Sequence, residues 1–96
     1  MNMVPGGWKI DVKVNKNLSG MTLEQMSLFE TAFRNFEGAK YTPLLYIGSQ
    51  VVAGLQHAYV AECRLISPHP VEPTLVKVVV YLSSDNQLSI SQISAI

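Results

Sequence analysis

The sequence predicts an α+β fold in which one α-helix packs across an antiparallel β-sheet of four to five strands. Three observations support this prediction. Residues 21–38 carry the only helical pattern, alternating residues in 8–14 precede it, and strand patterns alone follow from Tyr41 onward. A single helix beside an antiparallel meander is an α+β arrangement. The length of 96 residues predicts one domain over residues 1–96, in which we expect 1–7 to form a flexible N-terminal segment.

The segment before the helix, residues 8–14, alternates between apolar and polar side chains. Its sequence is WKIDVKV, and a period of two residues is typical of a half-buried strand. Turn-type residues fill 15–20, so we expect the strand to end there.

The helix is predicted within residues 21–38. Thr22 and Gln25 have the spacing of a capping box, in which each side chain satisfies a backbone amide of the first turn. Gly38 is a residue that can end a helix in a left-handed conformation. Apolar side chains recur at steps of three and four and predict one buried stripe, formed by Leu23, Met26, Phe29, Phe33 and Phe36.

The remaining chain is predicted to form a meander of four strands. Pro43 must lie at an edge, an end or a bulge of the first of them, because proline cannot donate to a strand ladder. Prolines predict a loop after the second strand, and the sequence SSDNQ predicts a turn after the third. The predicted strands span residues 41–49, 55–67, 74–82 and 88–96.

Between the first two strands of this meander lies the sequence QVVAG, formed by Gln50, Val51, Val52, Ala53 and Gly54. Turn-type residues bracket the apolar ones, so the segment is predicted to be a hairpin tip that exposes apolar side chains to solvent. Such exposure indicates that a partner covers the tip. The alternative interpretation is an ordinary hairpin turn in which the valines are incidental.

Composition excludes several classes of partner. Seven basic residues balance seven acidic ones, so the formal net charge is zero. A neutral chain lacks the positive field that holds nucleic acid or an acidic membrane surface, and we expect neither partner. The single cysteine, Cys63, excludes an internal disulfide and is typical of a reducing compartment. We therefore expect a cytoplasmic location, and secretion if a signal peptide has been removed.

The residues able to carry chemistry do not form a catalytic or metal-binding pattern. His57, His69 and Cys63 occur without the motifs that surround a catalytic serine or cysteine. Two isolated histidines and one cysteine are too few to hold a zinc ion. We expect His57 on a strand surface, His69 in an exposed loop, and Cys63 packed as a small apolar residue. The sequence thus predicts a binding protein and not an enzyme, without catalytic residues, metal or cofactor.

Two motifs resemble those of the cystatin family, and specifically of its disulfide-free, single-domain stefins. QVVAG fits the family's Gln-x-Val-x-Gly loop, and MVPGG in residues 3–7 resembles the N-terminal segment that ends in the family's glycine. The order of elements and the chain length also match, so the resemblance covers nearly the whole chain.

The resemblance implies a cystatin-like fold and a reversible, tight-binding inhibitor of papain-like cysteine proteases. It implies that the N-terminal segment and the QVVAG hairpin block the active-site cleft of the protease, which supplies all the reactive groups. Either Gly6 or Gly7 would hold the position of the family's glycine. The residues implied to contact the protease are Val4, Pro5, Gly6, Gly7, Gln50, Val51, Val52, Ala53, Gly54, Ser83 and Ser84.

A second function from a different class is a non-inhibitory interaction module on the same fold, or an engineered binding scaffold. The second hairpin favours it, because residues 82–87 read LSSDNQ where the family often carries proline with Trp, His or Gly. We expect a monomer. Val51 and Val52 are β-branched and disfavour the positive φ of tight turns, so strain at this tip predicts a domain-swapped dimer on heating.

Overall fold

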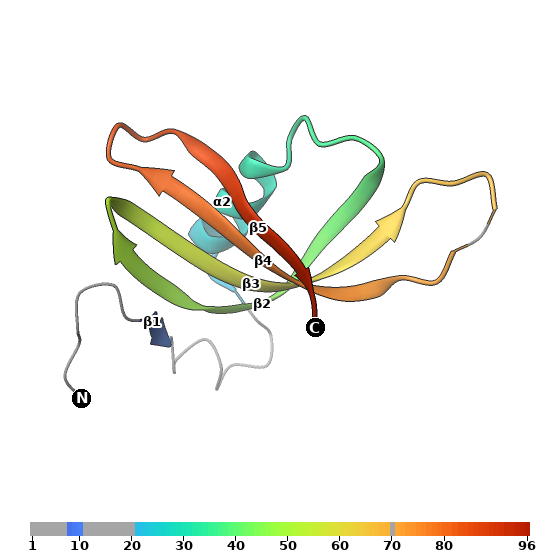
Figure 1. Cartoon of the computed structure of the whole chain (residues 1–96), viewed down its shortest axis with the longest axis horizontal. Helices are drawn as coiled ribbons and strands as arrows, with labels where there is room; N and C mark the ends of the chain where they lie inside the picture. The colour runs from blue at the N-terminus through green and yellow to red at the C-terminus, as the bar shows by residue number, and fades with distance from the viewer. Residues whose placement is uncertain (1–7, 11–20, 70) are drawn as a thin grey trace.

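One helix and five antiparallel strands form the part of the chain that the computed structural model describes, residues 8–10, 21–69 and 71–96 (Figure 1). The sheet order follows the chain, β1-β2-β3-β4-β5. This arrangement confirms the α+β class and the antiparallel meander. The predicted flexible segment 1–7 and residues 11–14 of the first predicted strand lie outside the described residues. The elements are β1 Trp8–Ile10, α2 Leu23–Ala32, β2 Ala39–Val52, β3 Gly54–Leu65, β4 Thr74–Ser83 and β5 Leu88–Ala95.

Strand β2 contains Pro43, which was predicted to lie at an edge, an end or a bulge of its strand. The pairing of β2 with β3 shifts register between Pro43 and Leu45, and again between Tyr46 and Gly48. Pro43 therefore lies at an irregularity of the ladder, as predicted. The same strand runs without interruption into the tip segment, so Val51 and Val52 are strand residues paired with Leu55 and Gly54.

Helix α2 begins as predicted and ends earlier. The Thr22 hydroxyl accepts a 3.2 Å hydrogen bond from the Gln25 amide, and the Gln25 side-chain oxygen accepts one of 3.0 Å from the Thr22 amide. This capping box satisfies two amides of the first turn. The helix ends at Ala32 with Phe33 as its C-cap, so the prediction that Gly38 ends the helix is wrong. Gly38 does have a positive φ of 90°, directly before β2.

An aromatic cluster explains why the helical pattern of the sequence continues beyond the end of the helix at Ala32. Phe33 stacks on Tyr41 of β2 with 4.7 Å between ring centroids, and Phe36 meets the same ring edge-on at 5.3 Å. The chain turns after Ala32, and both phenylalanines contact one strand residue. Phe36 is nevertheless 43% exposed, so it lies at the margin of the core.

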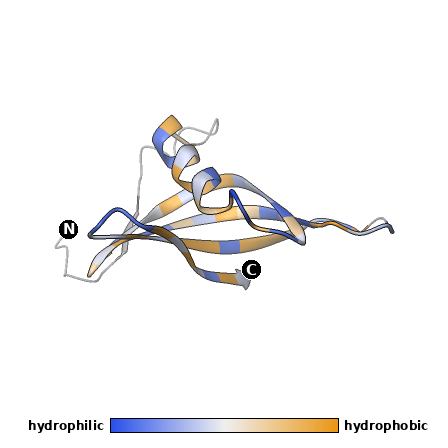
Figure 2. Ribbon diagram, turned by 90° about the horizontal axis from the view of Figure 1, so that it is seen from above, coloured by the Kyte–Doolittle hydropathy of each residue, from blue (hydrophilic) through white to orange (hydrophobic). Residues whose placement is uncertain are grey.

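The core lies between α2 and one face of the curved sheet (Figure 2). Phe29 is fully buried and packs edge-on against Tyr59 of β3 at 5.0 Å. The Tyr59 hydroxyl donates a 2.6 Å hydrogen bond to the backbone carbonyl of Gln25, which ties the first turn of the helix to the sheet. The predicted stripe is wrong at Leu23, which is 86% exposed. The buried face of the helix is centred on Phe29.

Candidate functional site: the hairpin end of the sheet

Two hairpin connections lie at the same end of the sheet (Figure 1). Ala53 joins β2 to β3, and residues 84–87 join β4 to β5. Gly54 pairs with Ser83, so the two connections are adjacent across the β3–β4 ladder. Strand β1 begins at this end as well, because Trp8 pairs with Gln50 and β1 runs antiparallel to β2. The fold thus gathers three separate parts of the sequence at one edge of the molecule, which we call the hairpin end.

The β2–β3 tip is narrow and apolar. Val51 is 56% exposed and Val52 is 40% exposed, and Ala53 between the strands is exposed too. Alternation along β2 directs neighbouring side chains to opposite faces of the sheet. Consequently Val51 presents apolar surface on one face of the hairpin and Val52 on the other. The prediction of an exposed apolar hairpin tip is confirmed.

The reason for glycine at position 54 is internal to the fold. Gly54 has a φ of 126°, and a Cβ atom built there would lie 2.5 Å from the backbone oxygen of Leu82. Only glycine tolerates both the conformation and the close approach. Positive φ therefore falls on Gly54, and the valines keep the negative φ of strand residues. The strain that we expected in Val51 and Val52 is absent, and the domain-swapped dimer remains a prediction without that argument.

Tyr81 supports the tip from β4, a role that no sequence pattern indicated. Its hydroxyl donates a hydrogen bond to the carbonyl of Ala53 at the turn. Tyr81 pairs with Gln56 in the β3–β4 ladder, so a central strand holds the phenol in place. Within a strand pattern such as TLVKVVVYL, a tyrosine is an ordinary strand residue, which is why sequence reasoning missed it.

An apolar row extends from the tip across one face of the sheet. Val51 pairs with Leu55, Leu55 with Leu82, and Leu82 with Leu88. Leu55 is 37% exposed, which adds accessible apolar surface next to Val51. The sequence interpretation stopped at Gly54 and missed Leu55, although its place directly after the motif could have indicated it.

The β4–β5 connection is a polar turn organised by Ser83. The Ser83 hydroxyl accepts a 3.0 Å hydrogen bond from the Gln87 amide and donates one to the Asp85 carboxylate. Its backbone accepts from the Asn86 amide at 3.0 Å, and Asn86 adopts a φ of 66°. Ser83 is therefore committed to the turn itself, whereas Ser84 is exposed beside it.

His57 lies behind the tip on β3, as expected, but its side chain is half-buried and not fully exposed. Its Nδ1 atom is 2.8 Å from the Tyr46 hydroxyl, and its Nε2 atom is buried and finds no hydrogen-bond partner among the described residues. Burial lowers the pKa of His57, because the charged imidazole loses solvation. The ring is thus held neutral close to the hairpin end. By contrast, His69 is exposed, and Cys63 packs against the core, as expected.

Of the residues predicted to form the site, seven lie at the hairpin end: Gln50, Val51, Val52, Ala53, Gly54, Ser83 and Ser84. The other four, Val4, Pro5, Gly6 and Gly7, lie outside the described residues. No charged side chain occurs between Gln50 and Gln56, so the surface of the tip offers apolar contact and backbone polar groups. Between Gln50 and Gln56 no titratable side chain is available for acid–base chemistry.

Within the part of the chain that the structure describes, no group of three or more His, Cys, Asp or Glu residues could hold a metal ion. The described ranges also contain no helix long and apolar enough to cross a bilayer. No protein-family model, no curated protein and no solved structure matches this chain.

Proposed function

We propose that this chain is a reversible, tight-binding inhibitor of papain-like cysteine proteases, built on a cystatin-like fold. The observation that carries the proposal is the β2–β3 tip with the sequence QVVAG, whose two valines are exposed on opposite faces of one narrow hairpin. A deep and narrow protease cleft accommodates a hairpin of this shape. Since the single cysteine suits a reducing compartment, we propose the cytoplasm as the location.

The hairpin end supplies what a blocking wedge requires. Burial of Val51 and Val52 would contribute up to about 1.5–3 kcal/mol for each side chain. The tip loses little conformational entropy on docking, because Gly54 and the Tyr81 hydrogen bond already fix its shape. Trp8 pairs with Gln50, so β1 begins beside this tip, and the segment containing Val4, Pro5, Gly6 and Gly7 precedes β1 in the sequence. In the proposed complex this segment occupies the cleft next to the hairpin.

The inhibitor takes no chemical part in this mechanism. The protease supplies its own thiolate and imidazole, and the inhibitor denies substrate access to them. In the proposed complex the hairpin lies across the cleft and presents no peptide bond to the protease thiolate. Because the sheet holds the backbone on both sides of Ala53, the hairpin is not hydrolysed. Inhibition is then stoichiometric and reversible.

A titration of a papain-like protease with the purified chain tests the proposal. We expect activity to fall linearly to near zero at one equivalent of inhibitor, while mass spectrometry shows the chain intact. Full activity at micromolar concentrations of the chain would overturn the proposal. Loss of activity accompanied by cleavage of the chain would identify a substrate instead.

A second candidate function is a non-inhibitory interaction module, or an engineered scaffold, with the same fold. The polar β4–β5 turn favours it, because Ser83 forms hydrogen bonds with Asp85 and Asn86 and the turn leaves little apolar surface for a protease. An absence of inhibition together with an intact, folded chain is the outcome expected for this class.

A further inference from the structure

Strand β5 forms one outer edge of the sheet. It pairs with β4 on one side, and among the described residues no strand pairs with its other side. Edge strands in natural proteins usually carry charged residues or proline, which prevent pairing with another chain. Residues 88–96 read LSISQISAI and contain neither. This edge therefore lacks charge and proline as protection against strand addition, and the protective feature that it does carry is a β-bulge, at the register shift between Val79 and Val80 of β4.

The pattern of side chains along β5 is nearly palindromic. A register shift lies between Val79 and Val80 of β4, so that Ile90 pairs with Val80 and Ile93 with Val78. Ser91 is the additional residue, and Ile90 and Ile93 consequently face the same side of the sheet. Read in either direction, residues 88–95 run apolar, Ser, Ile, polar, polar, Ile, Ser, apolar.

We propose that β5 is a self-association edge at which two copies of this chain pair antiparallel about a two-fold axis. Antiparallel self-pairing requires a strand whose pattern matches its own reverse, because residue i faces j while j faces i. The palindrome centred between Ser91 and Gln92 meets this requirement. It sets Ile90 opposite Ile93 of the second copy, and Ser89 opposite Ser94. The product is one continuous sheet with five strands from each copy.

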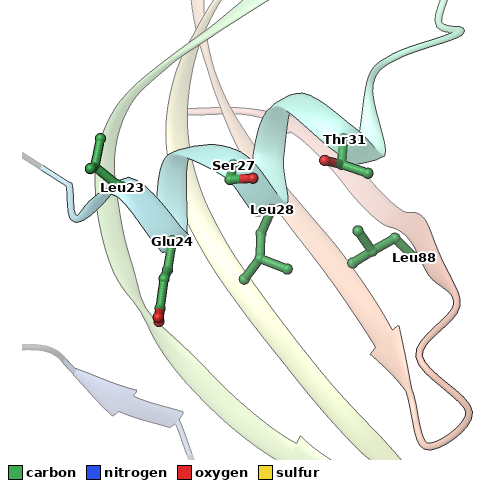
Figure 3. A pocket seen from close by; sticks show the side chains of 6 residues that line it. All are labelled: Leu23, Glu24, Ser27, Leu28, Thr31 and Leu88. Atoms are coloured by element: carbon green, nitrogen blue, oxygen red, sulfur yellow. The ribbon is translucent and has the colours of Figure 1, made fainter.

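The surface next to this edge carries apolar groups that the pairing would cover. A groove of about 460 Å³ lies between α2 and β5, and Leu28 and Leu88 point into it from the two sides (Figure 3). The two-fold axis stands perpendicular to the sheet, so both helices lie on the same face. The register brings Ala95 of the second copy beside Leu88, followed by Ile96, which is 73% exposed here. Ala95 and Ile96 of one copy thus meet the groove of the other, in which Leu28 and Leu88 supply apolar surface beside Glu24, Ser27 and Thr31.

The size of the edge predicts a weak and reversible dimer. Eight residues of strand span roughly 27 Å, and an edge contact of this length falls at the small end of protein–protein interfaces. The two hairpin ends point in opposite directions in this dimer, so the tips stay accessible. The inference is therefore independent of the proposed inhibitory function.

A pair of double variants tests both the dimer and its register. In the variant with Ser89→Lys and Ser94→Lys, two lysines face each other at each of the two symmetric contacts across the axis. In the variant with Ser89→Lys and Ser94→Glu, a lysine faces a glutamate at each of these contacts. Both sites lie on the face of the sheet away from α2. Ser89 is exposed and Ser94 half-buried, so we expect the variants to fold, which circular dichroism checks. The readout is sedimentation equilibrium from about 10 µM to about 1 mM chain.

We expect the parent chain to dimerise reversibly within this concentration range. The Lys/Lys variant should dissociate at least about tenfold more readily than the parent, and the Lys/Glu variant should dimerise at least as well as the parent. A parent chain that stays monomeric at the highest concentration overturns the proposal. Equal effects of the two variants overturn the register. A dimer that forms only after heating and persists on dilution is a strand-exchanged species and also counts against it.

Discussion

The phenol of Tyr81, on β4, donates a hydrogen bond to the carbonyl of Ala53 at the β2–β3 turn. A one-residue connection between two strands is thereby fastened to a third strand. The Tyr81 ring also lies close to Gly54. A Cβ atom built at Gly54 would lie 3.0 Å from the Tyr81 hydroxyl oxygen. The shape of the tip is therefore set by β4 as well as by its own sequence.

Replacement of Tyr81 by phenylalanine should weaken inhibition about three- to tenfold, because one hydrogen bond contributes about 0.5–1.5 kcal/mol. The tip would lose its anchor while its apolar surface stays the same. The measurement is the inhibition constant against one papain-like enzyme. Tyr41→Phe, in the aromatic cluster at the end of α2, is the matched control and should leave the constant unchanged. Equal constants for parent and Tyr81→Phe would show that the bond does not shape the binding surface.

Val52→Asp should abolish inhibition and leave the melting temperature nearly unchanged. An unpaired carboxylate buried in a protease cleft is strongly unfavourable, whereas on a side chain already 40% exposed it is tolerated in the free protein. Val71 is also 40% exposed and lies in the loop between β3 and β4, so Val71→Asp is the matched control. Loss of inhibition in both variants would show that the effect of Val52→Asp is not specific to the hairpin end.

Alanine at position 54 should destabilise the protein more than alanine at position 38. Both glycines have positive φ, which an alanine tolerates at a cost of about 1–2 kcal/mol. A Cβ at Gly38 meets no atom within 4 Å, whereas at Gly54 it would lie 2.5 Å from the Leu82 oxygen. Overpacking of this kind adds about 1–3 kcal/mol. Urea unfolding of the two variants measures the difference, and only Gly54→Ala should also impair inhibition.

Stability should fall when the pH drops below the ordinary pKa of histidine, 6.5. Burial lowers the pKa of His57 in the folded chain, so the unfolded chain binds the proton first. The free energy of unfolding is therefore highest above pH 6.5 and declines below that pH. It levels off once His57 is protonated in the folded protein as well. Urea midpoints between pH 8 and pH 4 follow this decline. His57→Gln should reduce the decline, and His69→Gln, at an exposed site, should retain it.

Ser84→Trp should tighten inhibition by about 1–2 kcal/mol if the protease covers most of the ring. Ser84 is exposed beside the tip, whereas Ser83 bonds to both Gln87 and Asp85 and is needed for the turn. A tryptophan at position 84 supplies the large apolar anchor that the polar turn lacks. An unchanged inhibition constant would show that the β4–β5 turn does not reach the protease.

Local patterns in the sequence predicted the order of elements, since capping and alternation depend on neighbouring residues. The Thr22–Gln25 capping box and the bulge at Pro43 are of this kind. Errors arose where contacts between distant segments decide the structure. Phe33 and Phe36 contact Tyr41 after the helix has ended, and the Tyr46 hydroxyl lies 2.8 Å from Nδ1 of the half-buried His57. Tyr81 was missed for the same reason, because its partner lies 28 residues away.

The uncharged tip also has a kinetic consequence. Gln50 to Gln56 include no acidic or basic residue, and Asp85 is the one such residue in the turn beside them, residues 84–87. Long-range attraction between charges accelerates protein association and weakens as salt is added, so a partner approaching this end gains little from it. Encounter through the hairpin end should therefore proceed at the ordinary rate of diffusion and orientation. That rate should vary little between dilute buffer and physiological ionic strength.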